Sequence, residues 1–256
     1  MLVFSGCKNI YMQIDINCDM GEGIGREELI MPFISSANIA CGYHAGDAET
    51  MYDTMKLCSK YNVAVGAHPS FFDRVNFGRI TMQLPVNELY ELVTQQLIIF
   101  SEVAESADQK MVHVKPHGAL YNLSARDALV AKVIAGAVKD FDNRLILVGL
   151  SGSYSIMQAE AAGLKTSNEV FADRTYQDDG SLTPRSQVNA LIEDTGKVME
   201  QVLQMIKEGT VTTISGKTIP VVAETICIHG DGTHAADFAK TIHDTLQKNS
   251  ILISSP

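Results

Sequence analysis

The chain has 256 residues, and 46% of them are hydrophobic, which is enough apolar material for one large core. Its formal net charge is -10 and its pI is about 5.1, so neither nucleic acid nor an anionic membrane is expected as a partner. No apolar run approaches the roughly 20 residues of a membrane span. The five cysteines are odd in number and show no C-x-x-C spacing, which predicts reduced thiols and a cytoplasmic protein.

The domain organisation is simple. Residues 1–11 lack the apolar region and cleavage site of a secretory signal. We interpret them as an N-terminal extension without a function or as a choice of start site, because Met12 directly precedes the first predicted strand. No linker, low-complexity tract or charge block divides the rest, so residues 12–256 are predicted to form a single domain.

Predicted strands and helices alternate along the chain. Strands are expected at residues 13–19, 38–41, 63–68, 111–115, 145–150, 164–171 and 224–229. Helices are expected at residues 27–34, 48–61, 86–106, 125–141, 153–162, 196–207 and 235–248. This alternation favours a parallel sheet closed into a barrel over an open doubly wound sheet. Polar loops at 69–85 and 173–185, and a hairpin or flap at 210–222, interrupt the alternation and are expected to be functional.

Polar residues gather where the predicted strands end. In three strands they alternate with apolar residues, so the polar residues of each strand share a face. These sets are Asp15, Asn17 and Asp19; His113, Lys115 and His117; and His229 and Asp231. Because the outer face of a barrel strand packs against helices, we expect the polar sets to point inward and to form one site at the rim of the barrel.

Two chemistries compete for this site. Asp19, His44 and His68 would form a divalent metal triad, since carboxylate and imidazole suit zinc, manganese or iron. Alternatively, the same groups move protons and position a substrate. No local H-x-x-x-H or H-E-x-x-H spacing supports a metal, so its ligands would have to converge from separate strands.

Signals for anion binding are present but less specific. The glycine-rich segment 21–25 follows a strand and precedes a helix, where backbone N–H groups would face a phosphate. The candidate cations for a phosphate or a carboxylate are Lys115, Arg79, Arg174 and Arg185.

Eight blocks of sequence, in order from Asp15 to Asp231, resemble the LamB/YcsF family. They are DINCDMGEG (15–23), ANIACGYHAGD (37–47), GAHPS (66–70), FGR (77–79), HVKPHGALYN (113–122), EVFADR (169–174), LTPR (182–185) and IHGD (228–231). The resemblance implies an irregular seven-stranded (β/α) TIM-like barrel of the glycoside hydrolase/deacetylase type. It also implies a catalytic subunit that cleaves 5-oxo-L-proline to L-glutamate, coupled to hydrolysis of ATP with Mg²⁺, and that works with subunits B and C of a 5-oxoprolinase. The residues before Met12, and residues 74–76 just before the FGR block, depart from the family pattern.

On these blocks we expect a catalytic set and a substrate-binding set. The catalytic set is Asp19, Glu22, His44, His68, Lys115, His117 and Asp231. The substrate-binding set is Asp15, Asn17, Asn38, Asp47, Arg79, Tyr121, Asn122, Glu169, Asp173, Arg174, Arg185 and His229. Lys115 would stabilise the transferred phosphate, the acids Asp19, Glu22 or Asp231 would hold Mg²⁺ or act as base, and the histidines would move protons. Arg79 or Arg174 would bind the substrate carboxylate.

Two other functions stay open. One is a metal-dependent deacetylase-like hydrolase that acts on a carbohydrate or an amide through Asp19, His44 and His68. The other is a non-catalytic subunit that binds substrate or serves as a scaffold. Binding of a transition metal is expected only for the deacetylase-like enzyme, and a homo-oligomer is compatible with every interpretation.

Overall fold

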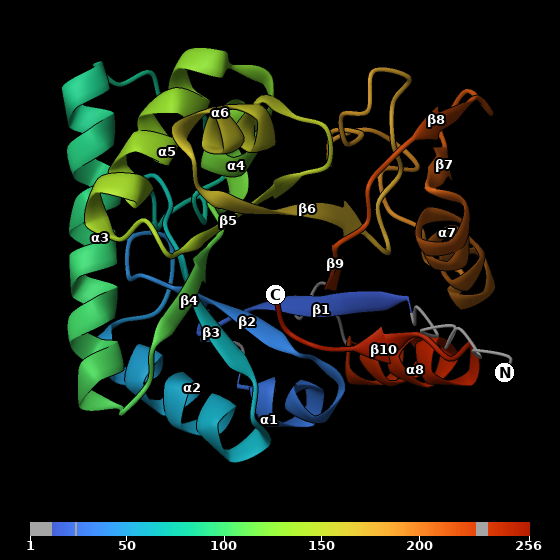
Figure 1. Ribbon diagram of the computed structural model, residues 1–256, viewed down its shortest axis with the longest axis horizontal. Coiled ribbons are helices and arrows are strands. Elements are labelled where there is room, and N and C mark those ends of the chain that lie inside the picture. The colour runs from blue at the N-terminus through green and yellow to red at the C-terminus, as the bar shows by residue number, and fades with distance from the viewer. Residues whose placement is uncertain (1–11, 24, 229–234) are drawn as a thin grey trace, which may run out of the picture.

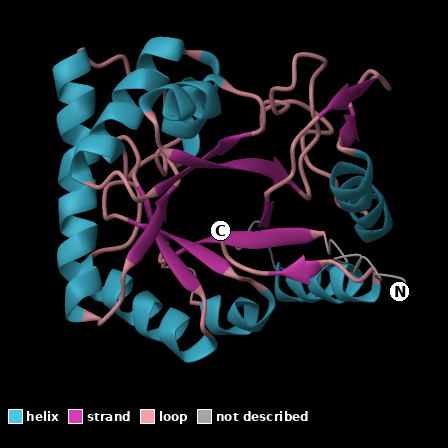
Figure 2. Ribbon diagram, in the orientation of Figure 1, coloured by secondary structure: helices cyan, strands magenta, loops and turns pink. Residues whose placement is uncertain are grey.

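The strand–helix alternation folds into a closed parallel barrel with helices outside it (Figures 1 and 2). The computed structural model describes residues 12–23, 25–228 and 235–256. The barrel strands are β1 (Gln13–Met20), β2 (Ser36–Ala40), β3 (Ala64–His68), β4 (Met111–Val114), β5 (Ile146–Leu150), β6 (Lys165–Phe171) and β9 (Thr225–Ile228). The helices are α1 (Glu27–Ile30), the 3-10 turn η1 (Met31–Phe33), α2 (Ala48–Tyr61), α3 (Val86–Ser106), α4 (Gly118–Arg126), α5 (Ala128–Phe141), α6 (Tyr154–Ala162), α7 (Thr195–Glu208) and α8 (Ala235–Lys248). The predicted seven-stranded barrel is therefore confirmed.

The barrel closes between its first and last strands. β1 pairs in parallel with β2 on one side and with β9 on the other, where Asp15 lies opposite Thr225 and Asn17 opposite Cys227. A short strand, β10 (Leu252–Ile253), pairs with the beginning of β1. Because every barrel strand is parallel, all their C-terminal ends meet at one rim, and this rim is where the polar clusters were expected.

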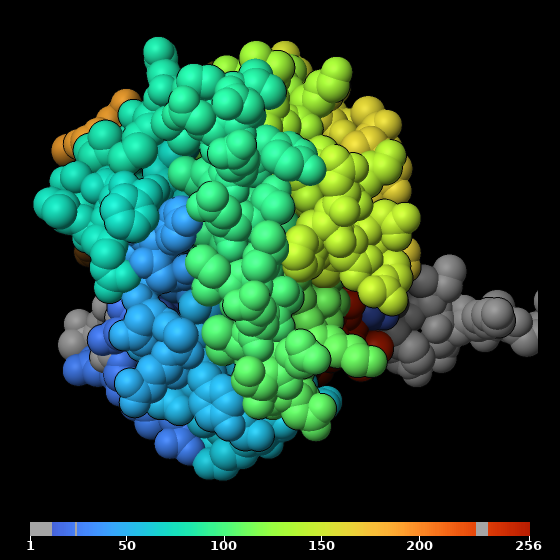
Figure 3. Space-filling view, turned by 90° about the vertical axis from the view of Figure 1, so that its left-hand side faces the viewer, coloured from blue at the N-terminus to red at the C-terminus, as the bar shows by residue number. Residues whose placement is uncertain are grey.

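Alternation along β1 separates a polar lumen from an apolar outer layer. Ile14, Ile16 and Cys18 belong to the hydrophobic core, whereas Asp15 and Asn17 are buried and hydrogen-bonded to other polar side chains. The helices cover the apolar side, and α3 runs down one face of the molecule between α2 and α5 (Figure 3). The described cysteines are all buried thiols, in agreement with the sequence. Among the described residues there is no helix with the length and hydropathy that a membrane span requires.

Two details differ from the predicted elements. The helix expected at 125–141 begins three residues later, at Ala128, because the side chain of Asp127 accepts hydrogen bonds from the N–H groups of Leu129 and Val130 and so starts α5. A separate helix before it was not predicted except for its last two residues. The preceding helix, α4, begins at Gly118, directly at the rim. The strand β10 was not predicted, since two residues carry no readable alternation. The predicted hairpin at 210–222 is confirmed as β7 (Thr210–Thr212) and β8 (Thr218–Pro220).

Candidate functional site

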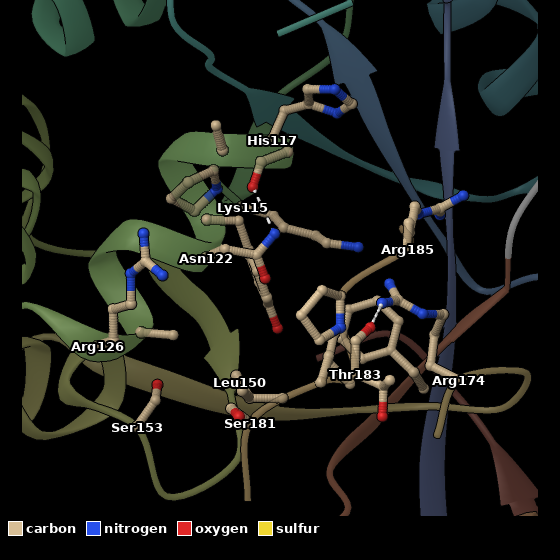
Figure 4. A pocket seen from close by; sticks show the side chains of 18 of the residues that line it. Lys115, His117, Asn122, Arg126, Leu150, Ser153, Arg174, Ser181, Thr183 and Arg185 are labelled. Carbon is tan, nitrogen blue, oxygen red and sulfur yellow. Dashed lines mark hydrogen bonds between the residues drawn. The ribbon is translucent and has the colours of Figure 1, made fainter. Parts of the chain in front are cut away.

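A pocket of about 930 Å³ lies at the C-terminal rim of the barrel. Its wall comes from the ends of β1 and β3–β6, from α4 and from the two long loops that the sequence singled out. Figure 4 shows Lys115 and His117 on one side of the pocket, and Arg174 and Arg185 across from Arg126. The loops at 69–85 and 173–185 thus contribute to the wall, as their length and polarity predicted.

Lys115 is buried at the base of this pocket and is 2% exposed. Its Nζ atom lies 3.0 Å from Asp19 Oδ1 and 2.8 Å from Glu169 Oε1. Burial alone would lower the pKa of Lys115, but the charges of Asp19 and Glu169 outweigh it and raise the pKa well above its usual value. The ammonium group is therefore a fixed positive charge, held by two acids at the base of the pocket.

Asp19 is the most exposed member of this group, with a side chain that is 19% exposed, and it lines the pocket together with Lys115. Burial favours its neutral form, but His68 and Lys115 hold the pKa of Asp19 well below the usual range. Its Oδ2 atom lies 3.3 Å from Nε2 of His68. Asp19 is thus an ionised carboxylate shared between an imidazole and an ammonium group.

Below Lys115, a layer of buried amides and hydroxyls sets the positions of these charges. Asn17 donates to Glu169 Oε1 at 2.9 Å, and Asn38 donates to Asn17 Oδ1 at 2.7 Å and to Asp19 Oδ1 at 2.9 Å. Nε2 of His113 lies 2.8 Å from Asn38 Oδ1. Burial lowers the pKa of His113 to about 3, so the ring is neutral and donates from Nε2. Asn17, Asn38, His113 and Glu169 do not line the pocket, and they position the groups that do.

The backbone of β3 is shaped to admit the His113 ring. A Cβ atom built on Gly66 would lie 2.1 Å from Nε2 of that ring. Only glycine leaves the space in which His113 can reach Asn38 across the lumen.

Beside Asp19, three imidazoles and one carboxylate gather. The rings of His44 and His117 are stacked, with centroids 3.8 Å apart and planes 5° apart. Glu22 Oε1 lies 3.2 Å from Nε2 of His44 and 3.7 Å from Nδ1 of His117. Burial, aided by the neighbouring charge of His68, lowers the pKa of His44 to about 3 and that of His117 well below its usual value. We call Glu22, His44, His68 and His117 the histidine cluster.

The predicted metal triad differs from this geometry. One potential ligand atom from each member of the histidine cluster lies within 4.8 Å of the others. Among the described residues, that group contains His44 and His68 but not Asp19, which pairs with both Lys115 and His68. The carboxylate that completes the group is Glu22, from the turn after β1.

The arginines of the wall are held in different ways. Arg174 is buried and donates to the carbonyl oxygens of Ala190 and Thr183, at 3.3 and 2.6 Å. Arg79 lies over the ring of Phe77, 5.0 Å from its centroid. Arg126 and Arg185 are exposed and line the pocket. Arg174 therefore fixes the loop after β6, and the other three place positive charge around the opening.

Comparison with known proteins places the chain in a family. A model of the LamB/YcsF family matches residues 14–256. The chain belongs to the LamB/YcsF family. The A subunit of the 5-oxoprolinase from Staphylococcus carnosus (strain TM300) is 48% identical over 248 residues, which cover 95% of this chain and 98% of that protein.

Solved structures agree with this membership. The lactam utilization protein from Thermus thermophilus matches with a TM-score of 0.89 and 37% identity, over 96% of this chain and 100% of that one. A T48 deacetylase matches with a TM-score of 0.52 and 12% identity, over 95% of this chain and 87% of that one. The second likeness shows the fold alone, and it confirms the expected deacetylase-type barrel.

Most of the site residues expected for this LamB/YcsF member lie at the pocket. Those that line it are Asp19, Glu22, His68, Arg79, Lys115, His117, Tyr121, Asn122, Arg174 and Arg185. His44 lies directly behind them, stacked on His117. His229 and Asp231 lie outside the described residues, as does the 1–11 extension.

Six expected substrate-binding residues do not line the pocket of this LamB/YcsF member: Asn17, Asn38 and Glu169, which lie in the layer below Lys115, and Asp15, Asp47 and Asp173. Asp47 caps α2, where its side chain accepts from the N–H of Thr50 at 2.9 Å. Asp15 accepts from the hydroxyls of Ser35 and Ser36 in the lumen. Asp173 is not among the residues that line the pocket. The carboxylates of Asp15 and Asp47 are hydrogen-bonded to other groups of the chain, and none of the three acids lines the space that a substrate would occupy.

Several pocket residues were missed by sequence reasoning. Arg126 and Ser153 line the wall, and Cys227 Sγ lies 3.2 Å from the ammonium group of Lys115. Arg126 ends α4, of which only the last two residues fall within a predicted helix, so its place at the rim was not visible. Strand β9 directs Cys227 to the lumen, opposite Asn17 in the β1–β9 register. Alternation in the sequence places Cys227 on the same face as His229 and Asp231, so the sequence signal was present.

Proposed function

We propose that this protein is the A subunit of a 5-oxoprolinase and cleaves 5-oxo-L-proline to L-glutamate with concomitant hydrolysis of ATP. The name of the Staphylococcus carnosus relative, a 5-oxoprolinase, and its 48% identity over nearly the full length support the substrate. The use of ATP, the participation of Mg²⁺ and an assembly with subunits B and C are parts of the proposal. The buried thiols suit a reducing compartment, so we include the cytoplasm in it.

The observation that carries the proposal is the charge of the pocket. The chain as a whole has 20 Lys and Arg against 30 Asp and Glu. The pocket wall reverses this balance, with the five cations Arg79, Lys115, Arg126, Arg174 and Arg185 against the three acids Asp19, Glu22 and Asp179. Its volume of about 930 Å³ exceeds what a five-membered lactam needs. Such a pocket suits a small carboxylate together with a polyphosphate.

The chemistry needs such charges. A lactam carbonyl is a poor electrophile, and transfer of the γ-phosphoryl group of ATP to its oxygen would activate the carbon as ADP leaves. A first water would add to that carbon, and the ring C–N bond would break as the nitrogen gains a proton. A second water would then hydrolyse the resulting acyl phosphate to the carboxylate of glutamate and free phosphate. Negative charge develops on oxygen in each step, so a fixed cation next to the reacting oxygen lowers the barrier.

The geometry supports a role for each charged group. Lys115 would stabilise the phosphorylated oxygen, because its ammonium group is fixed at the base of the pocket. Asp19 lines the same base and offers the hard oxygen ligands that Mg²⁺ prefers. Arg79 would bind the substrate carboxylate, since the bonds from Arg174 to two backbone carbonyls commit that side chain to its own loop.

A metal-dependent hydrolase is the second candidate, and the histidine cluster is the observation that favours it. Such an enzyme would act on its amide without ATP. The two functions therefore differ in whether product formation requires the nucleotide.

The deciding experiment measures L-glutamate and ADP together. The purified chain is combined with its partner subunits and given 5-oxo-L-proline and ATP. We expect the two products to appear together, each only when both substrates are present. Asp19→Asn should abolish both, because it removes the acid between Lys115 and His68. The matched control is Asp47→Asn, which keeps a cap on α2 and should retain activity. Glutamate without ATP, or ADP at the same rate without 5-oxoproline, would reject the proposal.

A further inference from the structure

The orientation of the three imidazoles in the histidine cluster has a clear cause. Each ring makes a hydrogen bond through its remote nitrogen. Nδ1 of His68 lies 2.7 Å from the carbonyl oxygen of Lys115, and Nε2 of His117 lies 3.0 Å from that of Phe77. A carbonyl oxygen can only accept, so both nitrogens carry a proton.

The ring of His44 follows the same rule through a hydroxyl. Its Nδ1 lies 2.9 Å from Ser70 Oγ, and Ser70 donates its own proton to the carbonyl oxygen of Phe71 at 3.0 Å. The Ser70 oxygen is therefore left to accept, and Nδ1 of His44 donates to it. When such a ring is neutral, its remaining nitrogen carries a lone pair.

These lone pairs converge. Nδ1 of His117 and Nε2 of His68 are only 2.9 Å apart, and Asp19 Oδ2 lies 3.3 Å from the same Nε2. Nε2 of His44 and the carboxylate of Glu22 complete the group. Acceptors cannot face one another at such distances without a positive species between them, which is either a proton or a metal ion.

We propose that Glu22, His44, His68 and His117 bind one divalent transition-metal ion of the zinc class. Three imidazoles and a carboxylate are borderline ligands that suit Zn²⁺, Co²⁺ or Fe²⁺ and do not suit Mg²⁺. A tetrahedral zinc site with bonds of about 2.0–2.1 Å has ligand atoms about 3.4 Å apart. The observed separations of 2.9, 3.2 and 3.7 Å bracket that value. The widest pair, within 4.8 Å, needs one side chain to move inward.

The supporting contacts match those of metal-binding histidines. A ligating imidazole usually donates its other N–H to a carbonyl, a carboxylate or a similar acceptor, which fixes its tautomer and its angle. Here all three rings do so, to two backbone carbonyls and one serine hydroxyl. Glu22, His68 and His117 also line the pocket, so a bound ion would be reached from it and would polarise an oxygen placed there.

This site does not depend on the proposed function, so its test measures binding. Protein stripped with a chelator is titrated with Zn²⁺ and, separately, with Co²⁺, by calorimetry and visible absorption. We expect one equivalent of each to bind, with the intense absorption of tetrahedral Co²⁺. Glu22→Gln and His44→Gln should each weaken binding by more than the roughly 10- to 100-fold that loss of a supporting partner costs. Ser70→Ala removes only the hydrogen-bond partner of His44, so it should weaken metal binding by roughly 10- to 100-fold.

Two further variants separate this site from the alternatives. Asp19→Asn should still bind one equivalent of metal, whereas a triad built on Asp19 would lose it. His243→Asn, on α8, is the control for a histidine outside the cluster and should leave binding unchanged. The absence of stoichiometric binding to the parent protein would overturn the proposal, as would unchanged binding in folded Glu22→Gln.

The position of the ion can also be tested on the parent protein, without any variant. Crystals of the parent protein soaked in Zn²⁺ should show one strong anomalous peak within bonding distance of the four side chains. A peak elsewhere, with none in the cluster, would reject the site.

Discussion

Nδ1 of His117 lies 2.9 Å from Nε2 of His68, while each ring already donates its other N–H to a backbone carbonyl. Two neutral rings in these orientations would direct lone pairs at each other. The contact therefore requires one proton more than two neutral imidazoles carry, or a metal ion that replaces it. The nearby carboxylate of Asp19 balances that positive charge.

The first prediction concerns the protons of this pair. In metal-free protein labelled with ¹⁵N-histidine, Nδ1 of His68 and Nε2 of His117 should be protonated, and a third proton should lie between the rings. Zn²⁺ should remove that third proton and leave the outer two in place. The ¹⁵N chemical shifts and the one-bond N–H couplings report each state. Bare outer nitrogens in the metal-free protein would contradict the assignment.

The second prediction concerns Lys115→Met. Turnover of 5-oxoproline with ATP should be lost, because the variant lacks the cation that lies between Asp19 and Glu169 at the base of the pocket. The substitution leaves two carboxylates near each other without that counter-charge, so stability should also fall, by about 3–5 kcal/mol. Urea unfolding and the coupled assay measure the two effects.

The control for this variant is Lys132→Met, which removes an exposed lysine from α5 and should change neither quantity. Combining Lys115→Met with Glu169→Gln removes one of the stranded charges and should recover part of the stability without activity. Near-normal turnover by Lys115→Met would refute the role of the lysine.

The third prediction pairs two glycines. Gly66→Ala should destabilise the protein by about 3 kcal/mol or more, since the new methyl group would overlap the buried ring of His113. The displaced ring would also lose its bond to Asn38 and so disturb the layer below Lys115.

Gly136→Ala is the matched substitution, because a Cβ at that position in α5 meets nothing within 4 Å. It should stabilise the protein by about 0.5–1 kcal/mol, the usual gain of alanine over glycine inside a helix. Denaturation midpoints of both variants check the pair, and equal effects of the two would contradict the steric explanation.

The fourth prediction follows from Asp15. Burial raises its pKa to about 6, although hydrogen bonds from Ser35, Thr225 and Ser36 offset part of that effect. The unfolded value is near 3.9, so between these two pH values the folded state binds more protons than the unfolded state. Stability should therefore fall as pH rises from about 4 to 6 and level off above, with a contribution from Asp15 of at most about 3 kcal/mol.

Asp15→Asn should remove this contribution to the slope, because an amide does not titrate and the hydroxyls around it can rotate to accept. Asp108→Asn is the control, in an exposed turn whose positive φ asparagine tolerates. Free energies of unfolding measured from pH 4 to 7 would show the difference. An unchanged slope in Asp15→Asn would mean that Asp15 stays ionised in this range.

Sequence pattern correctly predicted which side chains of β1 face the lumen of the barrel. Alternation in β1 placed Asp15 and Asn17 in the lumen, and the structure confirms it, because side chains of a strand must point to opposite faces. The same pattern does not say which inward group reaches the pocket. Asp15 and Asn17 lie deeper than Asp19 because they come earlier in a strand whose C-terminal end forms the rim.

The histidine cluster could not be predicted from sequence pattern. His44, His68 and Glu22 come from three separate segments, and no spacing in the chain links them. Their ligand atoms meet because β1, β2 and β3 are adjacent in the barrel and because Ser70 and two carbonyls turn the rings. Asp19 and Glu22 both lie close to the three imidazoles, so only the distances in the structure show which carboxylate completes the group.

The sequence by itself determined the class of the fold, the rim at which polar groups collect and the family to which the chain belongs. These properties follow from local periodicity and from ordered blocks of residues, which are written along the chain. Only the tertiary structure decided that Lys115 is held between Asp19 and Glu169, that cations outnumber acids in the pocket wall, and that three lone pairs converge beside Glu22. Pairing, charge balance and ring orientation depend on distances between segments far apart in the chain, and closure of the barrel sets those distances.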